Sequence, residues 1–181
     1  TVMDAIQVIL YGSISSSFLN KAADDAKNKR SVLSYLKGEQ KDGTANRGGC
    51  DFCSNIVLEI EDTGSHQVSC AGLAFEVRKN DSEIRKMIYF SHSGRIPESG
   101  YLTAEGYPYT NQEIRKLVEE RAATAENRGR DINRIYPSKE AYTNALYDVL
   151  LGYIDGRRFT VMEKSAIALR MTDGTGQFIK N

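Results

Sequence analysis

The sequence predicts an α+β fold in one domain, with an antiparallel sheet packed against an N-terminal helix and two later helices. Two observations carry this prediction. A β-patterned pair of segments occupies about 55–78, and helical periodicity lies before it and again after residue 110. Because helices and strands are segregated along the chain and do not alternate strictly, an antiparallel sheet is favoured over a parallel one. A chain of 181 residues is most simply one domain.

The first 37 residues have the apolar spacing of helices. Apolar side chains recur there mostly at steps of three and four residues. Gly12 and the serines that follow it interrupt this pattern, which predicts either a break or a bend near Gly12. Gly38 is placed to end the helical region, and the polar segment 38–49 has no periodicity and is expected to be a loop.

The central segment reads as a β-hairpin. "NIVLEIE" and "HQVSCAGLAFEVRK" are rich in β-branched residues and are joined by "DTGS", a turn sequence. Ile56, Leu58 and Ile60 alternate with polar or smaller residues and are expected to share one face of the sheet. After the hairpin, Asn80 to Ser82 offer helix caps, whereas "MIYF" suits a strand equally well, and 91–109 is expected to be a long loop.

The second half predicts two helices and then strands. Thr110 with Glu113 forms a capping box for a helix that extends to about Asn127. Ser138 caps the next helix, which ends before Gly156. The C-terminal segment, about 158–180, is expected to form two or three short strands with "DGTG" as a turn.

The charge balance limits the classes of partner. The chain has 24 Lys and Arg against 24 Asp and Glu, so it has no overall positive field for nucleic acid, which is not favoured as a partner. Its apolar runs are too short to span a bilayer, so no membrane is expected. A protein partner or a homo-oligomer is favoured. The odd number of cysteines, three, favours a reducing, cytoplasmic compartment over secretion.

All three cysteines lie near one histidine. Cys50, Cys53, His66 and Cys70 have the spacing C-x2-C-x12-H-x3-C, which resembles that of zinc fingers of the Cys2HisCys kind. In a strand, however, His66 and Cys70 would lie about 13 Å apart and could not share one ion. No cofactor is therefore expected, and Zn2+ is the alternative. Buried thiols, one disulfide from Cys70 to Cys50 or Cys53, and a redox C-x-x-C remain further interpretations.

The second histidine is the candidate for catalysis. His92 lies in "SHSGR", close to Arg95 and Glu98, and hydrolases and ribonucleases combine these residue types. Glu59 or Glu76 could replace Glu98 as the carboxylate. These residues support an alternative function, a small secreted or injected effector with hydrolase or ribonuclease activity. A loop histidine without a role is the simpler interpretation.

Tyrosines and arginines outside these clusters support the favoured function. The expected surface draws on two sets of residues, Tyr101, Tyr107 and Tyr109 in the long loop, and Arg128, Arg130 and Arg134 in the connector between the two helices. Aromatic residues and arginine are enriched at protein interfaces. The sequence therefore predicts a non-enzymatic protein-interaction or assembly module, with the His92 effector and a zinc-stabilised module of a larger assembly as alternatives.

Overall fold

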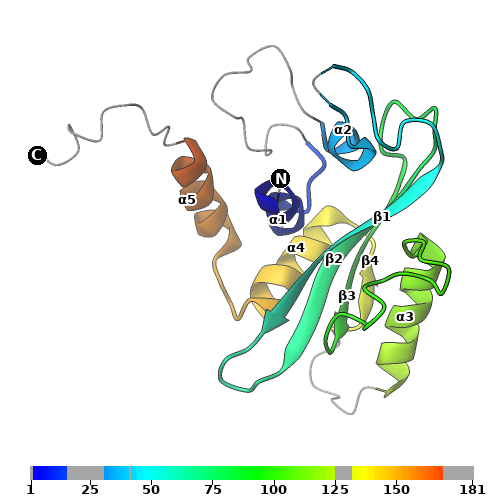
Figure 1. Cartoon of the computed structure of the whole chain (residues 1–181). Helices are drawn as coiled ribbons and strands as arrows, with labels where there is room; N and C mark the ends of the chain where they lie inside the picture. The colour runs from blue at the N-terminus through cyan, green and yellow to red at the C-terminus, as the bar shows by residue number, and fades with distance from the viewer. Residues whose placement is uncertain (1, 16–30, 41, 125–131, 169–181) are drawn as a thin grey trace, which may run out of the picture.

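Four antiparallel strands form the sheet of this computed structural model, in the spatial order β1-β2-β3-β4 (Figure 1). Their bounds are β1 (Phe52–Glu61), β2 (Val68–Val77), β3 (Lys86–Ser93) and β4 (Arg134–Tyr136). The structure describes residues 2–15, 31–40, 42–124 and 132–168. β1 and β4 are therefore the two edges of the sheet, and they differ greatly in length, ten residues against three.

Helices cover both faces of the sheet. They are α1 (Val2–Tyr11), α2 (Val32–Lys37), α3 (Asn111–Thr124), α4 (Lys139–Ala145), the π-helical segment η2 (Leu146–Leu150) and α5 (Gly156–Ala168). α1, α2, α4 and η2 pack on one face, and α3 packs on the other (Figure 1). None of the helices in the described part of the chain is both long enough and apolar enough to cross a membrane.

The alternation within β2 produces the two cores. Leu73 and Phe75 point into the larger core with α1, α2 and η2, whereas Ala74 points into the smaller core with Ile114 of α3. Both faces of β2 are apolar because this strand is central and covered on both sides, and almost all of its residues are buried. β1 alternates more clearly, since Ile56 lies in the larger core while Glu59 lies on the α3 side.

A polar turn closes the β1–β2 hairpin. The Asp62 carboxylate accepts the backbone N–H groups of Gly64 and Ser65, both at 2.8 Å, and the Asp62 N–H donates to the Gln67 carbonyl at 2.9 Å. His66 closes the turn with a positive φ of 56°. The connection therefore has six residues, Asp62 to Gln67, two more than "DTGS" predicts.

Most of the predictions of fold class and secondary structure are confirmed. The α+β class, the hairpin, the Gly38 cap and the Ser138 cap are present, and Thr110 and Glu113 bond reciprocally at the start of α3. The helix that begins at Val2 ends at Tyr11, immediately before Gly12. "MIYF" is part of strand β3, and residues 78–85, which include the possible caps Asn80 to Ser82, form turns and bends without a helix.

The prediction of C-terminal strands at 158–180 is wrong for the part that the structure describes. α5 occupies 156–168, and 169–181 lies outside the described residues. The missed signal is Asp155, whose carboxylate accepts the Arg158 N–H at 3.0 Å and caps the first turn. Phe159 then packs against Tyr147 with ring centroids 5.9 Å apart, which holds the helix on the larger core.

Candidate functional site

His92 lies on β3 and is fully buried under α3 and the segment 94–110, not in a loop as the sequence suggested. Its Nδ1 lies 2.9 Å from the Ser93 carbonyl oxygen, and its Nε2 lies 2.7 Å from the Tyr101 hydroxyl. A carbonyl can only accept, so Nδ1 carries the hydrogen and Nε2 accepts from the Tyr101 O–H. Both ring nitrogens are thus used in internal hydrogen bonds.

The strand register places His92 in a row of polar side chains. Glu59, Cys70 and His92 are directly opposite one another across β1, β2 and β3. Burial raises the pKa of the Cys70 thiol to about 11 and also raises the pKa of the Tyr101 phenol. Burial lowers the pKa of His92, and the Arg121 guanidinium acts in the same direction. At neutral pH the thiol, the phenol and the imidazole are therefore all uncharged.

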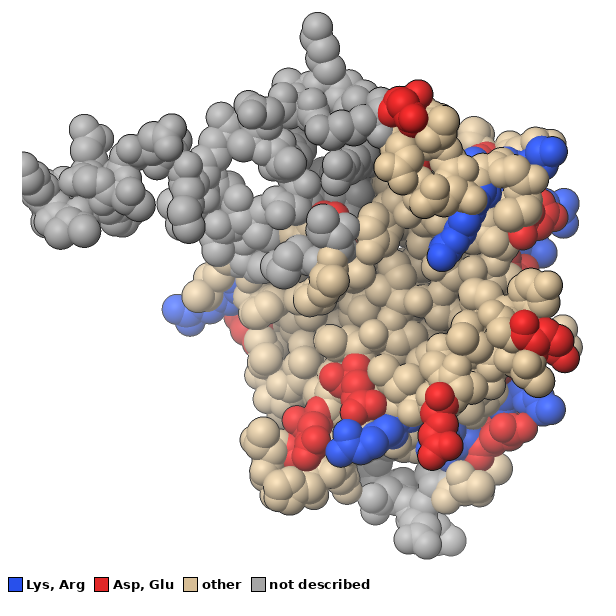
Figure 2. Space-filling view, viewed as in Figure 1, with Lys and Arg blue, Asp and Glu red and all other residues tan. Residues whose placement is uncertain are grey.

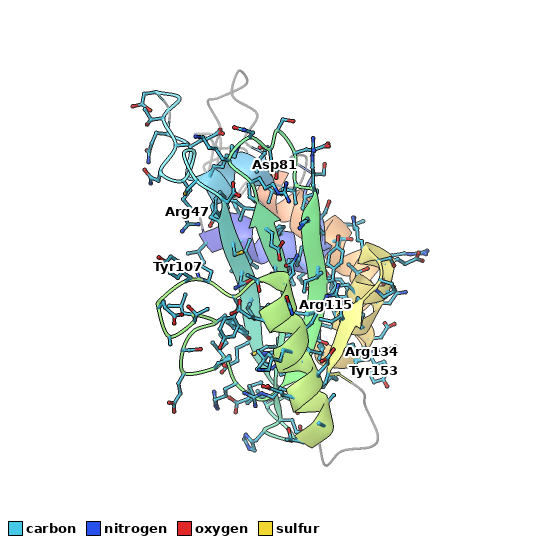
Figure 3. The ribbon with its side chains drawn as sticks, turned by 90° about the vertical axis from the view of Figure 1, so that its right-hand side faces the viewer. Arg47, Asp81, Tyr107, Arg115, Arg134 and Tyr153 are labelled. Atoms are coloured by element: carbon cyan, nitrogen blue, oxygen red, sulfur yellow. The ribbon has the colours of Figure 1, made fainter. Side chains whose placement is uncertain are left out.

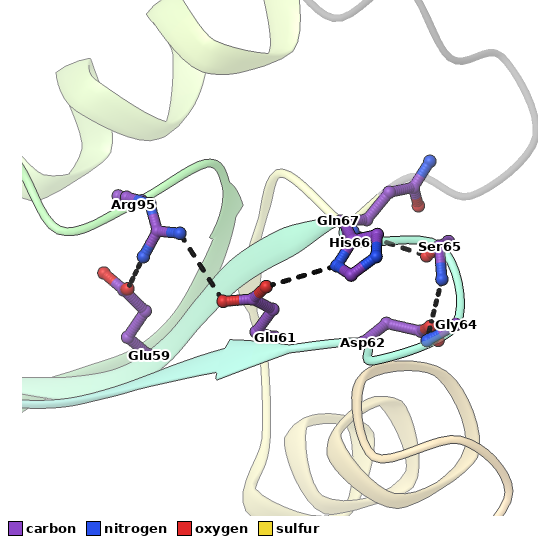
Figure 4. A network of polar contacts seen from close by, with 8 residues as sticks. All are labelled: Glu59, Glu61, Asp62, Gly64, Ser65, His66, Gln67 and Arg95. Carbon is purple, nitrogen blue, oxygen red and sulfur yellow. Dashed lines mark hydrogen bonds and ion pairs between the residues drawn. The ribbon is translucent and has the colours of Figure 1, made fainter.

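The three predicted catalytic residues are not brought together. The guanidinium of Arg95 bonds to Glu59 at 2.8 Å and to Glu61 at 3.4 Å (Figure 4), on the exposed side of the row. Glu98 is exposed in the loop, while His92 is buried. Of the other two carboxylates considered, Glu59 also accepts the Ile96 N–H at 2.8 Å, and Glu76 accepts the Asn111 N–H at 3.0 Å, which makes both structural partners.

The predicted zinc ligands lie at different places on the hairpin. Cys53 is the second residue of β1, whereas His66 is in the turn beyond the other end of this strand, and the strand from Cys53 to Glu61 alone spans about 27 Å. Cys70 is buried in β2, opposite Glu59, and Cys50 is exposed before β1. In the described residues, no group of three or more His, Cys, Asp and Glu side chains could hold a metal ion, and all three cysteines are free thiols.

The outer edge of β1 is a backbone edge that extends over a ten-residue strand. No other strand among the described residues pairs with it. The Asp62-to-Gln67 bond continues the β1–β2 ladder in register, so every second residue before Asp62 bonds to β2. The alternate residues of β1, which do not bond to β2, therefore direct their backbone N–H and C=O groups away from β2, toward the open edge. The outward residues are Cys53, Asn55, Val57, Glu59 and Glu61.

The segment 94–110 forms a wall beside this edge. Two bonds fix it to β1, one from the Ile96 N–H to Glu59 and one from the Asn55 side-chain amide to the Tyr109 carbonyl at 3.2 Å. Large apolar side chains of this segment are exposed, namely Ile96, Leu102 and Tyr107. Figure 3 shows Tyr107 projecting from the segment on the β1 side of the sheet.

The tyrosine and arginine surface predicted from the sequence is only partly present. Tyr101 is buried, Tyr109 is half-buried, and Tyr107 is exposed to 69 %. Arg134 is exposed on β4, and Arg128 and Arg130 lie outside the described residues. The face shown in Figure 2 has basic and acidic side chains next to one another, and its described part shows no large area of one sign.

No protein-family model, curated protein or solved structure matches this chain. The features that sequence reasoning missed are the open edge of β1 and the anchoring role of Tyr101. The hairpin itself was predictable, but its position at the sheet edge depends on which strand pairs with β3. Tyr101 had no distinguishing signal beyond its place after Gly100.

Proposed function

We propose that this protein is an interaction module that binds an extended segment of a partner protein along the outer edge of β1. The observation that carries the proposal is a ten-residue edge strand whose outward N–H and C=O groups pair with no strand among the described residues. A long unpaired edge can accept a further strand, because backbone hydrogen bonds supply affinity without requiring a particular sequence.

The segment 94–110 supports this use of the edge. An added strand would direct alternate side chains toward the α3 side, where Ile96, Leu102 and Tyr107 are exposed. Exposed aromatic and aliphatic side chains next to unpaired backbone groups provide side-chain contacts that can select among partners. The two bonds that fix this segment to β1 keep the wall in place before a partner arrives.

The site chemistry favours binding over catalysis. The buried cluster of Cys70, His92 and Tyr101 is uncharged at neutral pH, and its polar atoms bond to one another or to backbone carbonyls. A nucleophile needs a lowered pKa or a free base beside it, and a substrate needs access. We assign to this buried cluster the role of anchoring the segment 94–110 against the sheet.

Selection of short random peptides displayed on phage tests the proposal. Peptides selected on the wild-type protein are expected to lose binding to Cys53→Pro, because proline removes an outward N–H while leaving the ladder to β2 intact. They are also expected to bind Tyr107→Ala more weakly. Thermal unfolding of each variant provides the folding control. Peptides that bind all three proteins equally would contradict the proposal, as would a failure to select any peptide.

A further inference from the structure

The acidic side chains of β1 are confined to one end of its open edge. Among the outward residues, Cys53, Asn55 and Val57 are neutral, whereas Glu59 and Glu61 carry carboxylates. A strand added along this edge would therefore meet an uncharged half and an acidic half. This asymmetry is the basis for inferring the chemistry of the partner segment.

The carboxylates of Glu59 and Glu61 differ in their hydrogen bonds, their ion-pair distances and their exposure. Glu59 accepts from Arg95 at 2.8 Å and from the Ile96 N–H at 2.8 Å, and its side chain is 28 % exposed. Glu61 has longer contacts, 3.4 Å to Arg95 and 3.6 Å to His66, and its side chain is 45 % exposed (Figure 4). One guanidinium is thus shared by two carboxylates, and Glu61 is the one with remaining capacity to bind a cation.

Apolar side chains lie on both faces of the rest of the edge, although Ser54 and Asn55 are polar. Val57 contacts the smaller core from the α3 side, and Ile56, Leu58 and Ile60 contact the larger core from the other side. Side chains of an added strand would lie next to these residues, at the distances of cross-strand neighbours. Aliphatic side chains in the added strand would extend both cores, whereas a carboxylate beside Glu61 would be repelled.

We infer that the segment bound by β1 is an extended aliphatic strand with a lysine or arginine beside Glu61. This inference rests on the proposed function and adds the chemistry of the partner to it. A cross-strand pair of opposite charges is worth up to about five-fold in affinity, and a pair of like charges opposes binding by a similar factor. Salt should reduce this preference, because the pair lies at an exposed edge.

Charge reversal at Glu61 tests the inference. Random peptides displayed on phage are selected in parallel on the wild type, on Glu61→Lys and on Glu119→Lys, a control with the same charge change on the exposed side of α3. The wild type and the control are expected to enrich Lys or Arg at one end of an aliphatic peptide. Glu61→Lys is expected to enrich Asp or Glu at that end. Glu61→Gln, which removes only the charge, should show no charge preference.

The outcomes separate this inference from the proposed function. Peptides that bind in a Cys53-dependent way but show the same composition on the wild type and Glu61→Lys would overturn the inference and leave strand addition standing. Failure to enrich any edge-dependent peptide would overturn both. Light scattering tests a further outcome. If the wild type is a dimer and Cys53→Pro is a monomer, a second copy of the chain occupies the edge, which would contradict the inference.

Discussion

The imidazole of His92 accepts a hydrogen bond from the hydroxyl of Tyr101 at 2.7 Å, and both side chains are almost fully buried. Tyr101 has a positive φ of 61° and belongs to the segment that flanks the open edge of β1. This contact therefore joins the interior of the sheet to the wall of the proposed binding site. Its loss should affect both the stability of the fold and the position of the wall.

Removing the Tyr101 hydroxyl should destabilise the protein. Tyr101→Phe leaves Nε2 of His92 buried without its donor, which costs about 1–3 kcal/mol of unfolding free energy. Tyr142→Phe is the matched control, because the Tyr142 hydroxyl is buried in the larger core with no hydrogen-bond partner among the described residues. Its removal should be neutral or stabilising. Urea denaturation of both variants measures the difference, and equal losses would contradict the assigned role of Tyr101.

The stability of the protein should fall in mild acid because of His92. Burial lowers the pKa of this imidazole in the folded state, whereas the unfolded chain titrates near 6.5. Below about pH 6.5 the unfolded state binds the proton first, so the unfolding free energy decreases as the pH falls toward the folded-state pKa. Above pH 6.5 this contribution is fully present and constant.

Urea denaturation between pH 5 and 8 measures the effect of His92. His92→Gln, which keeps an acceptor for Tyr101, should reduce the slope of stability against pH in this range. The wild-type protein, denatured under the same conditions, is the reference. An unaltered slope in His92→Gln would contradict the account of the buried imidazole.

Gly72 should tolerate no side chain. A Cβ on this β2 residue would lie 2.6 Å from the Ile56 carbonyl oxygen and 3.1 Å from the Phe90 ring. The backbone oxygen cannot move without separating β1 from β2, so Gly72→Ala should cost about 1–3 kcal/mol. Gly49→Ala, at a position with no atom within 4 Å, is the control. Thermal unfolding compares them, and a Gly72→Ala midpoint equal to that of the control would show that the strands are farther apart.

The three thiols should react at very different rates. Cys50 is exposed, Cys53 is half-buried with a pKa raised by burial, and Cys70 is fully buried with a pKa raised to about 11. Only the thiolate is reactive, so a disulfide reagent should label Cys50 first, Cys53 more slowly, and Cys70 only after unfolding. Mass spectrometry of timed samples, with and without added zinc, measures this order. Protection of all three thiols by one equivalent of zinc would contradict the separation of Cys53, His66 and Cys70.

Local patterns in the sequence predicted the elements but not their neighbours. The hairpin and the caps at Thr110 and Ser138 depend on residues close in the chain, so they were predictable. The order of strands depends on contacts between distant segments, so the edge position of β1 was not. His92 was placed in a loop because glycine and serine surround it, whereas its pairing with Cys70 on β2 extends the strand through it.

The spacing of the cysteines and His66 resembles a zinc site, but the described structure does not bring these residues together. Residues at this spacing can bind one metal ion only if the chain between them folds back. Instead, β1 runs extended from Cys53 to Glu61, before the turn that contains His66. The same strand pattern that separates these residues produces the long edge. One physical feature, an extended and regularly alternating strand, therefore decides both the arrangement of the thiols and the proposed binding surface.

Amide hydrogen exchange along β1, measured by NMR with and without a selected peptide, tests the central claim most directly. In the free protein the inward amides of Ile56, Leu58 and Ile60 should exchange slowly, and those of Val57 and Glu59 should exchange quickly. Saturation with peptide should slow the exchange of Val57 and Glu59. Amides of Val57 and Glu59 that still exchange quickly in the saturated complex would contradict strand addition at this edge.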